Sequence, residues 1–204
     1  MILLRKAVAV MPVEIWRSFL IYCGINAFTP GPGNILALDT VANYGWARGR
    51  PLFFGIFTGY YLVQLLCAAA VYGVSAVFPH ALVLMKYVGA AYILYLAVHI
   101  VLSRPAQSGG ERSASFAQGF ALQLVNIKIY LFGITALTGF VVPFGASPAA
   151  LLRFALLIAS IGSLATGTWI CMGVLIRSFY SRHYRLIHLL LALALLRCAY
   201  SMLR

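Results

Sequence analysis

Four long stretches of this 204-residue chain contain no Asp, Glu, Lys or Arg. They cover residues 18–38, 51–85, 129–152 and 154–176. A helix that crosses the hydrocarbon core of a bilayer needs about 20 mostly apolar residues, because that core is roughly 30 Å thick. Each stretch is long enough, so the sequence predicts an all-α, polytopic membrane protein.

The composition excludes other classes. The mean hydropathy is +0.97 and 9% of residues are charged, whereas soluble domains carry about 25% charged residues. This excludes a soluble globular domain, a disordered chain and a disulfide-stapled secreted module. A net charge of +12 would indicate a nucleic-acid partner in a soluble chain. Here the basic residues are scattered between apolar stretches, so we expect them to report membrane topology and expect no nucleic-acid partner.

Short polar or Gly/Pro connectors divide the chain into six predicted membrane spans. We place these transmembrane helices at residues 15–38, 51–77, 81–103, 115–142, 149–176 and 185–203. The connectors after the first, third and fifth spans carry Arg48, Arg50, Arg104, Arg112, Arg177, Arg182 and Arg185. Loops rich in Lys and Arg stay in the cytoplasm, which predicts that both termini lie outside it, on the other side of the membrane. Residues 1–11 are expected to be an N-terminal extension without function.

The spans form two halves of three helices, residues 12–103 and 115–204, joined by a cytoplasmic loop at 104–114. An odd number of spans per half makes the halves antiparallel, as in the inverted repeats of secondary transporters. The first helix of each half is also interrupted, at Thr29–Asn34 and at Gln123–Lys128. Interruptions at matching places indicate a transport site.

Pro30 and Pro32 dominate the first interruption. Neither has an N–H, and each clashes with the carbonyl four residues earlier, so those carbonyls lose their helical partners. Asn34 is placed to cap the half-helix that follows. The N-terminus of that half-helix carries a partial positive charge and suits a carboxylate. The alternative is a purely structural kink.

Two charged residues are predicted to lie at membrane depth. Asp39 follows the expected cap by five residues, and Lys128 lies about 24 Å of helix beyond Arg112. Such charges face a partner or a cavity. We expect Asp39 and Lys128 to pair across the halves, or one to bind substrate while the other titrates; a structural ion pair or a snorkelling lysine are the alternatives.

The candidate substrate site comprises Asn26, Pro30, Gly31, Pro32, Asn34, Asp39, Gln123, Asn126 and Lys128. For Gln123 and Asn126, interhelical hydrogen bonding is the alternative.

Other residue types are assigned structural roles. Four spaced glycines indicate close helix packing: Gly45, Gly49, Gly55 and Gly59. Four cysteines without metal-ligand spacing are expected to be small buried apolar residues: Cys23, Cys67, Cys171 and Cys198. We expect no metal and no cofactor. His99 is given no role, and His183 and His188 are expected at the surface near a basic connector.

Two other function classes stay open. An intramembrane serine protease would need a nucleophile and a histidine base, for which Ser160 or Ser163 beside Gly162, with His99, are the weak candidates. No oxyanion signature accompanies them, and we expect no enzyme. The third class is a non-transporting membrane assembly subunit.

Several motifs carry a family resemblance. The sequence has Pro-Gly-Pro at 30–32, the spaced glycines, and Asn-Ile-Lys at 126–128. With its length and six apolar segments, the chain resembles the lysine exporter (LysE/RhtB) superfamily of bacterial amino-acid efflux proteins over nearly its whole length. The runs at 34–38, 89–93 and 120–128 are most similar to the cysteine/O-acetylserine exporter subgroup. Three residues depart from the family pattern. Gly33 stands where the family has Asn or Asp, Ile127 stands where it has Pro, and Asp39 stands where it has a small polar residue.

The resemblance implies a secondary exporter of small amino acids in the bacterial inner membrane, driven by the proton gradient. Consistent with this, the chain has no GxxxxGK[ST] phosphate loop. We expect the substrate carboxylate at Pro32–Asn34 with help from Lys128, and the ammonium or the coupled proton at Asp39. The expected partners are the substrate, protons and the lipid bilayer, with a homo-oligomer as an open alternative.

Overall fold

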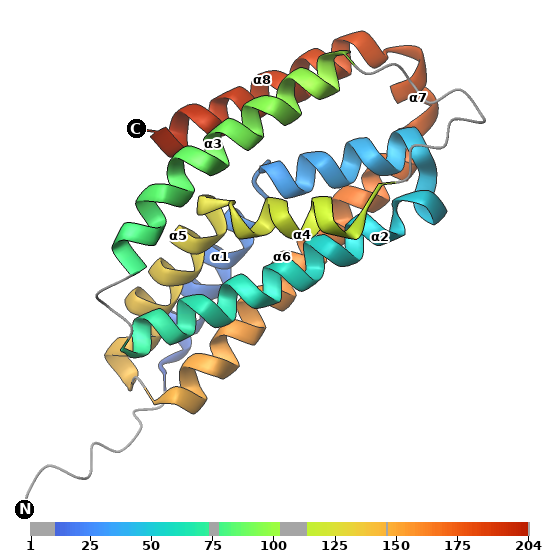
Figure 1. Ribbon diagram of the computed structural model, residues 1–204. Helices are drawn as coiled ribbons and strands as arrows, with labels where there is room; N and C mark the ends of the chain where they lie inside the picture. Colours follow the sequence, from blue (N-terminus) through green and yellow to red (C-terminus); the bar gives the residue numbers. More distant parts are fainter. Residues whose placement is uncertain (1–10, 74–77, 103–113, 146, 204) are drawn as a thin grey trace, which may run out of the picture.

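The computed structural model describes residues 11–73, 78–102, 114–145 and 147–203, and the regular structure of these residues is entirely helical (Figure 1). The expected extension at 1–11 and the loop at 104–114 lie almost wholly outside them. The α-helices are α1 (Val13–Phe28), α2 (Pro32–Tyr72), α3 (Phe78–Leu102), α4 (Phe116–Leu124), α5 (Ile127–Ala136), α6 (Pro148–Leu175), α7 (Arg177–Arg182) and α8 (Tyr184–Leu203). A π-helical turn, η1 (Leu137–Val141), and a 3-10 turn, η2 (Val142–Phe144), extend α5.

Two helices of the second half begin at serine caps. The hydroxyl of Ser115 accepts the backbone N–H of Gln118 at 3.1 Å, and the Gln118 side chain accepts the backbone N–H of Ser115 at 3.2 Å. Ser147 caps α6 by accepting the N–H of Ala150 at 3.2 Å, with Pro148 as the first helical residue. These contacts satisfy N–H groups that a helix start leaves unpaired, so they fix where α4 and α6 begin.

The connector expected between the first and second predicted spans is helical instead. Helix α2 has 41 residues and departs from helical geometry at Gly45, with φ 77° and ψ 173°. A left-handed φ favours glycine, and the chain bends sharply there (Figure 1). The predicted end of the first span at residue 38 was therefore wrong, because the helix continues to this bend.

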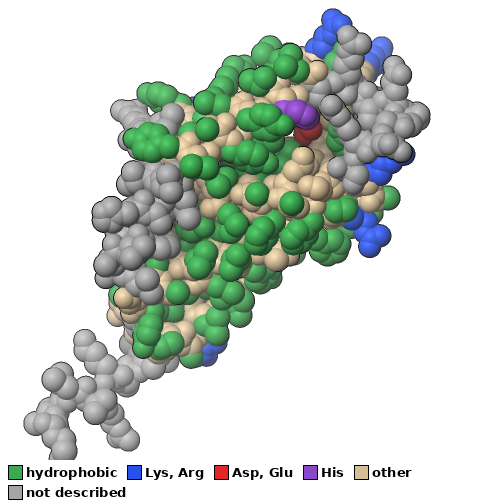
Figure 2. Space-filling view, in the orientation of Figure 1, with side chains coloured by type: hydrophobic (Ala, Val, Ile, Leu, Met, Phe, Trp, Pro, Cys, Tyr) green, Lys and Arg blue, Asp and Glu red, His purple; other side chains and the backbone are tan. Residues whose placement is uncertain are grey.

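Two of the basic connectors meet at one end of the described chain. A Cβ atom on Gly45 would lie 3.5 Å from a guanidinium nitrogen of Arg177. The bend therefore lies against the start of α7, close to Arg48 and Arg50. Most of the Lys and Arg side chains drawn in blue in Figure 2 lie toward this end.

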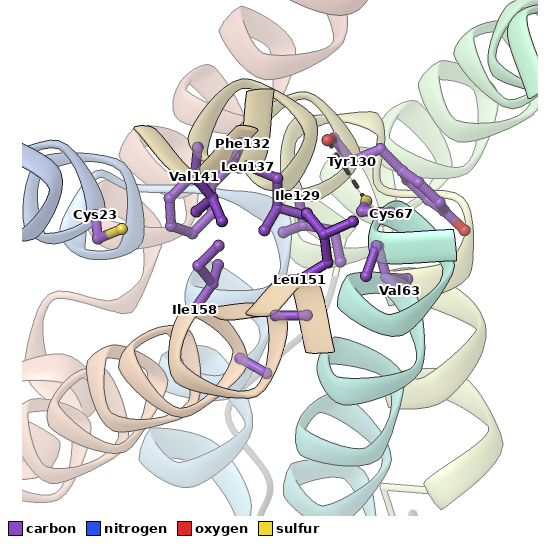
Figure 3. Packing of buried hydrophobic residues seen from close by; sticks show 14 of the residues in the cluster. Cys23, Val63, Cys67, Ile129, Tyr130, Phe132, Leu137, Val141, Leu151 and Ile158 are labelled. Carbon is purple, nitrogen blue, oxygen red and sulfur yellow. Dashed lines mark hydrogen bonds between the residues drawn. The ribbon is translucent and has the colours of Figure 1, made fainter. Parts of the chain in front are cut away.

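The helices form a bundle and an arm (Figure 1). In the bundle, α2 packs on α4 and α6, and α1 packs on α6. Figure 3 shows its apolar core, where the Cys67 thiol lies 3.7 Å from the Tyr130 carbonyl. In the arm, α3 and α8 run antiparallel side by side. The apolar cluster of the arm also includes Ile35, Leu122 and Ile127, which join it to the bundle.

Helices α2 and α4 cross with their backbones in contact. A Cβ atom on Gly55 would lie 2.1 Å from the Phe116 carbonyl oxygen, and one on Gly119 would lie 2.2 Å from that of Leu52. A Cβ atom on Gly59 would also meet α4, at 2.7 Å from the Gln123 Cβ atom and 3.2 Å from the Phe120 carbonyl oxygen. The packing role is thus confirmed for Gly55 and Gly59, whereas Gly45 serves the bend.

The surface is suited to lipid. The segments α2, 127–144 and α6 are long and apolar enough to cross a membrane, and the part of α3 from Tyr87 to Leu102 is a shorter apolar helix. Large apolar side chains are exposed, among them Leu164 at 70% and Leu175 at 82%, and they cover much of the face in Figure 2. The chain is therefore a polytopic helical membrane protein.

The cysteines divide into two groups. Cys23 and Cys67 are buried in the bundle core as expected. Cys171 is exposed and Cys198 is half-buried, so the expectation of four buried cysteines was wrong for this pair. Both lie on faces of α6 and α8 that other helices leave partly uncovered, and an apolar thiol is compatible with such a surface in a membrane protein.

Candidate functional site

The two helix breaks face each other. Helix α1 ends at Phe28 and α2 begins at Pro32, while α4 ends at Leu124 and α5 begins at Ile127. The ammonium group of Lys128 donates to the Thr29 carbonyl at 2.9 Å. The predicted interruptions are therefore present, and the chain brings them together.

Side chains from both halves satisfy the carbonyls at the end of α1. The Asn34 amide donates to the Ala27 carbonyl at 2.9 Å and accepts the Thr166 hydroxyl at 2.8 Å. The indole of Trp169 donates to the Phe28 carbonyl at 3.3 Å. Because backbone polar groups at membrane depth must find partners within the protein, these contacts stabilise the break.

The capping role expected for Asn34 was wrong. The N-cap of α2 is Gly31, and no side chain caps this end. Asn34 is the third residue of the helix, and its amide turns back toward the carbonyls of Ala27 and Thr29 at the break. The first N–H groups of α2 therefore have no side-chain cap.

Replacing Asn34 with alanine is expected to lower the free energy of unfolding by about 2 kcal/mol, because a buried carbonyl and the Thr166 hydroxyl both lose a partner. Thermal unfolding of the purified protein in detergent measures this. Thr166→Val, which removes the hydroxyl together with its need for a partner, should lower the melting temperature less. Equal melting temperatures for Asn34→Ala and the wild type would contradict this role.

The second break contributes buried amides. The Asn126 amide donates to the Gln123 side-chain oxygen at 3.1 Å. Both residues are buried, and the Asn126 side-chain oxygen has no hydrogen bond among the described residues. On α1, the Asn26 amide donates to the Tyr22 carbonyl at 2.9 Å.

A small cavity lies between the breaks, with a volume of about 20 Å³. Six of the expected site residues line it: Asn26, Gly31, Asn34, Gln123, Asn126 and Lys128. The space suits about one water molecule and is too small for an amino acid. Pro30 and Pro32 shape the break and are not among the lining residues of the described chain.

The expected Asp39–Lys128 pair was wrong. One Asp39 carboxylate oxygen accepts the Tyr180 hydroxyl and, at 3.0 Å, the Asn43 amide, and it lies 3.7 Å from His188 Nε2. Asp39 is seven residues along α2 from Pro32, about 10 Å of helix, and its carboxylate faces α7 and α8 instead of α5. The sequence does not show which way it faces.

The surface position expected for His188 was also wrong. Helix α8 begins at Tyr184, so His188 lies one turn inside and faces the buried carboxylate, with 2% of its surface exposed. Its proximity to the basic connector was misleading. His183 is exposed, as expected.

A second cavity, of about 320 Å³, lies between α2, α3 and α4. Its polar lining includes Asp39, Thr40, Tyr92, His99 and Gln118. Tyr95 also lines it, with its ring centroid 5.9 Å from that of His99. Figure 2 shows histidine and acidic side-chain atoms together on this otherwise apolar face. The sequence gives His99 no role, because a single histidine in an apolar helix more often has its polar atoms satisfied by a neighbour; the structure places it in this lining.

The comparison with known families decides the class. Residues 24–204 match the LysE type translocator family. The chain belongs to this family. Two relatives, both named cysteine/O-acetylserine efflux protein, are 36% identical over 190 residues, which cover 93% of this chain and 97% of each relative. They come from Escherichia coli (strain K12) and Shigella sonnei (strain Ss046). No solved structure matches.

Membership of the LysE family makes the chain a transporter and not an enzyme, and it confirms the resemblance to the cysteine/O-acetylserine exporters. The serine-protease alternative is therefore wrong. In the structure, the Ser160 hydroxyl bonds to the Tyr61 hydroxyl and to the Leu156 carbonyl, both at 2.8 Å. Within the described residues no group of three His, Cys, Asp or Glu side chains could hold a metal ion.

Proposed function

We propose that this LysE-family chain exports small amino acids of the cysteine/O-acetylserine type across the bacterial inner membrane, as a secondary transporter driven by the proton gradient. The family and the names of the relatives support amino-acid export. The observation that carries the mechanism is the meeting of two helix breaks around one cationic side chain, Lys128.

The substrate carboxylate binds at the N-terminus of α2. Gly31 and Gly33 line the small cavity, and the first turn of α2 has no side-chain cap. Its N–H groups and the helix dipole favour an anion, and the Lys128 ammonium adds a full positive charge. The buried Asn126 oxygen, which has no hydrogen bond among the described residues, accepts from the substrate ammonium.

The six spans act as two inverted repeats, 12–103 and 115–204. The pairing of equivalent elements supports this proposal: the α1/α2 break faces the α4/α5 break, α2 packs on α6, and α3 packs on α8. The gathering of Arg48, Arg50 and Arg177 at one end supports a cytoplasmic location for that end and periplasmic termini. Since the cavity at the breaks holds no more than about one water molecule, transport requires one half to rock against the other.

Cells that overproduce the protein and are loaded with labelled cysteine or O-acetylserine are expected to lose the label faster than control cells. An uncoupler is expected to remove this advantage, because uphill export then has no driving force. Labelled threonine and lysine test the range of substrates. Efflux that is insensitive to the uncoupler would contradict proton coupling.

Flux through the purified protein in proteoliposomes is the control for the remaining alternative. A transporter moves substrate without other proteins, whereas an assembly subunit does not. Absence of flux from active, folded protein would favour the assembly subunit.

A further inference from the structure

The cavity between α2, α3 and α4 is the larger of the two described above, at about 320 Å³ against about 20 Å³ at the breaks. We propose that it is the initial binding site, which takes the ammonium group of the substrate at the cytoplasmic end before the substrate reaches the breaks. This inference rests on the proposed export function. The volume of this cavity falls within the range of small-molecule sites, about 300–1,000 Å³.

Asp39 supplies the charge that an ammonium group needs. It is one of three acidic residues in the chain, and it lines this cavity. Among the described residues, its three polar contacts all use the same oxygen, Oδ1, and come from Tyr180, Asn43 and His188. These contacts hold the carboxylate in place and leave Oδ2 for a ligand, with 11% of the side chain exposed.

The opposite wall is aromatic. The rings of Tyr92 and Tyr95 stack with centroids 6.1 Å apart. The ring of His99, one turn further along the same helix, lies next to that of Tyr95. Aromatic faces attract ammonium groups through their quadrupole. Thr40 and Gln118 add hydroxyl and amide groups to the lining. A carboxylate opposite aromatic rings is chemistry for a primary ammonium, not for an anion.

The position of the cavity fits the start of an export path. Tyr44, which also lines it, is adjacent to the Gly45 bend at the basic end of the molecule. Asp39 and Pro32 lie on the same helix, about 10 Å apart along its axis. A substrate that binds at Asp39 is therefore two turns of α2 from the carboxylate site at the breaks.

Uptake of labelled L-cysteine into inside-out membrane vesicles tests the inference, because the cytoplasmic face is then outside. Asp39→Asn is expected to raise KM by about tenfold or more, the loss of one charge-assisted contact, with little change in the maximal rate. Tyr180→Phe is the matched variant: it loses a hydrogen bond to Oδ1 but keeps the carboxylate, so KM should rise less than about threefold. An unchanged KM in Asp39→Asn, or a loss confined to the maximal rate, would overturn the inference.

Cysteamine, an amine without a carboxylate, probes the same site directly. It is expected to inhibit uptake by the wild type and to inhibit Asp39→Asn much less. Tyr95→Leu changes the opposite wall and is a second, independent variant, which keeps the test possible if Asp39→Asn does not fold. It should also weaken the inhibition by cysteamine. Equal inhibition of all variants, or none of the wild type, would overturn the inference, whereas absence of L-cysteine uptake by the wild type would instead overturn the proposed function.

Discussion

Replacing Lys128 with alanine is expected to reduce efflux of labelled cysteine about 100-fold, the upper range for losing one charged hydrogen-bonding partner. Lys128 is the basic residue of the cavity lining at the breaks, and its ammonium lies against the Thr29 carbonyl. Without it, the N-terminus of α2 would have to hold the substrate carboxylate with partial charges alone. Efflux is measured from loaded cells at equal levels of membrane-inserted protein.

Two variants control this experiment. Lys128→Arg keeps the charge but not the compact ammonium, so partial activity is expected. Arg153→Ala removes a cation from an exposed position on α6. Among the described residues, the Arg153 side chain donates to the Ala149 carbonyl of its own helix. Transport should persist in this variant. Normal efflux by Lys128→Ala would remove Lys128 from the substrate site.

Replacing Gly55 with alanine is expected to lower the free energy of unfolding by about 3 kcal/mol, the upper range for overpacking. The added methyl group would lie 2.1 Å from the Phe116 carbonyl oxygen and 2.9 Å from the Phe120 amide nitrogen. These are backbone atoms, which cannot move aside as a flexible side chain can, so α2 and α4 must separate. The melting temperature in detergent, followed by size-exclusion chromatography, reports the effect.

Other glycines provide a matched control. An added Cβ atom at Gly24 in α1 or at Gly167 in α6 would meet no atom within 4 Å. Alanine there should leave the melting temperature unchanged or raise it slightly, because alanine favours the helix by about 1 kcal/mol over glycine. If Gly55→Ala melts like Gly24→Ala, the close backbone contact of α2 and α4 does not govern stability.

The first helix break was predictable because it follows from local chemistry. Pro30 and Pro32 remove N–H groups from the ladder wherever they stand, and α1 ends just before them. The all-helical membrane class was equally accessible, since the length of an uncharged run is a property of the sequence alone. The bend at Gly45 was not, because a glycine adopts left-handed or helical backbone with similar ease.

The partners of the polar residues were not predictable. Asp39 and Lys128 are oppositely charged and both were predicted at membrane depth, which favoured a pair, yet helix rotation points the carboxylate at Tyr180 and His188 instead. Asn34 had the right residue type for a cap, but its amide is needed by α1. Such choices depend on how distant helices pack, which no local pattern encodes.

The contact between Lys128 and the Thr29 carbonyl has a consequence for affinity. A lysine ammonium carries three N–H donors, and this carbonyl takes one of them. The carbonyl therefore anchors the flexible lysine side chain at the break before any substrate arrives. A carboxylate that binds the ammonium meets a side chain already held in position, so less side-chain entropy is lost on binding than with a freely rotating lysine.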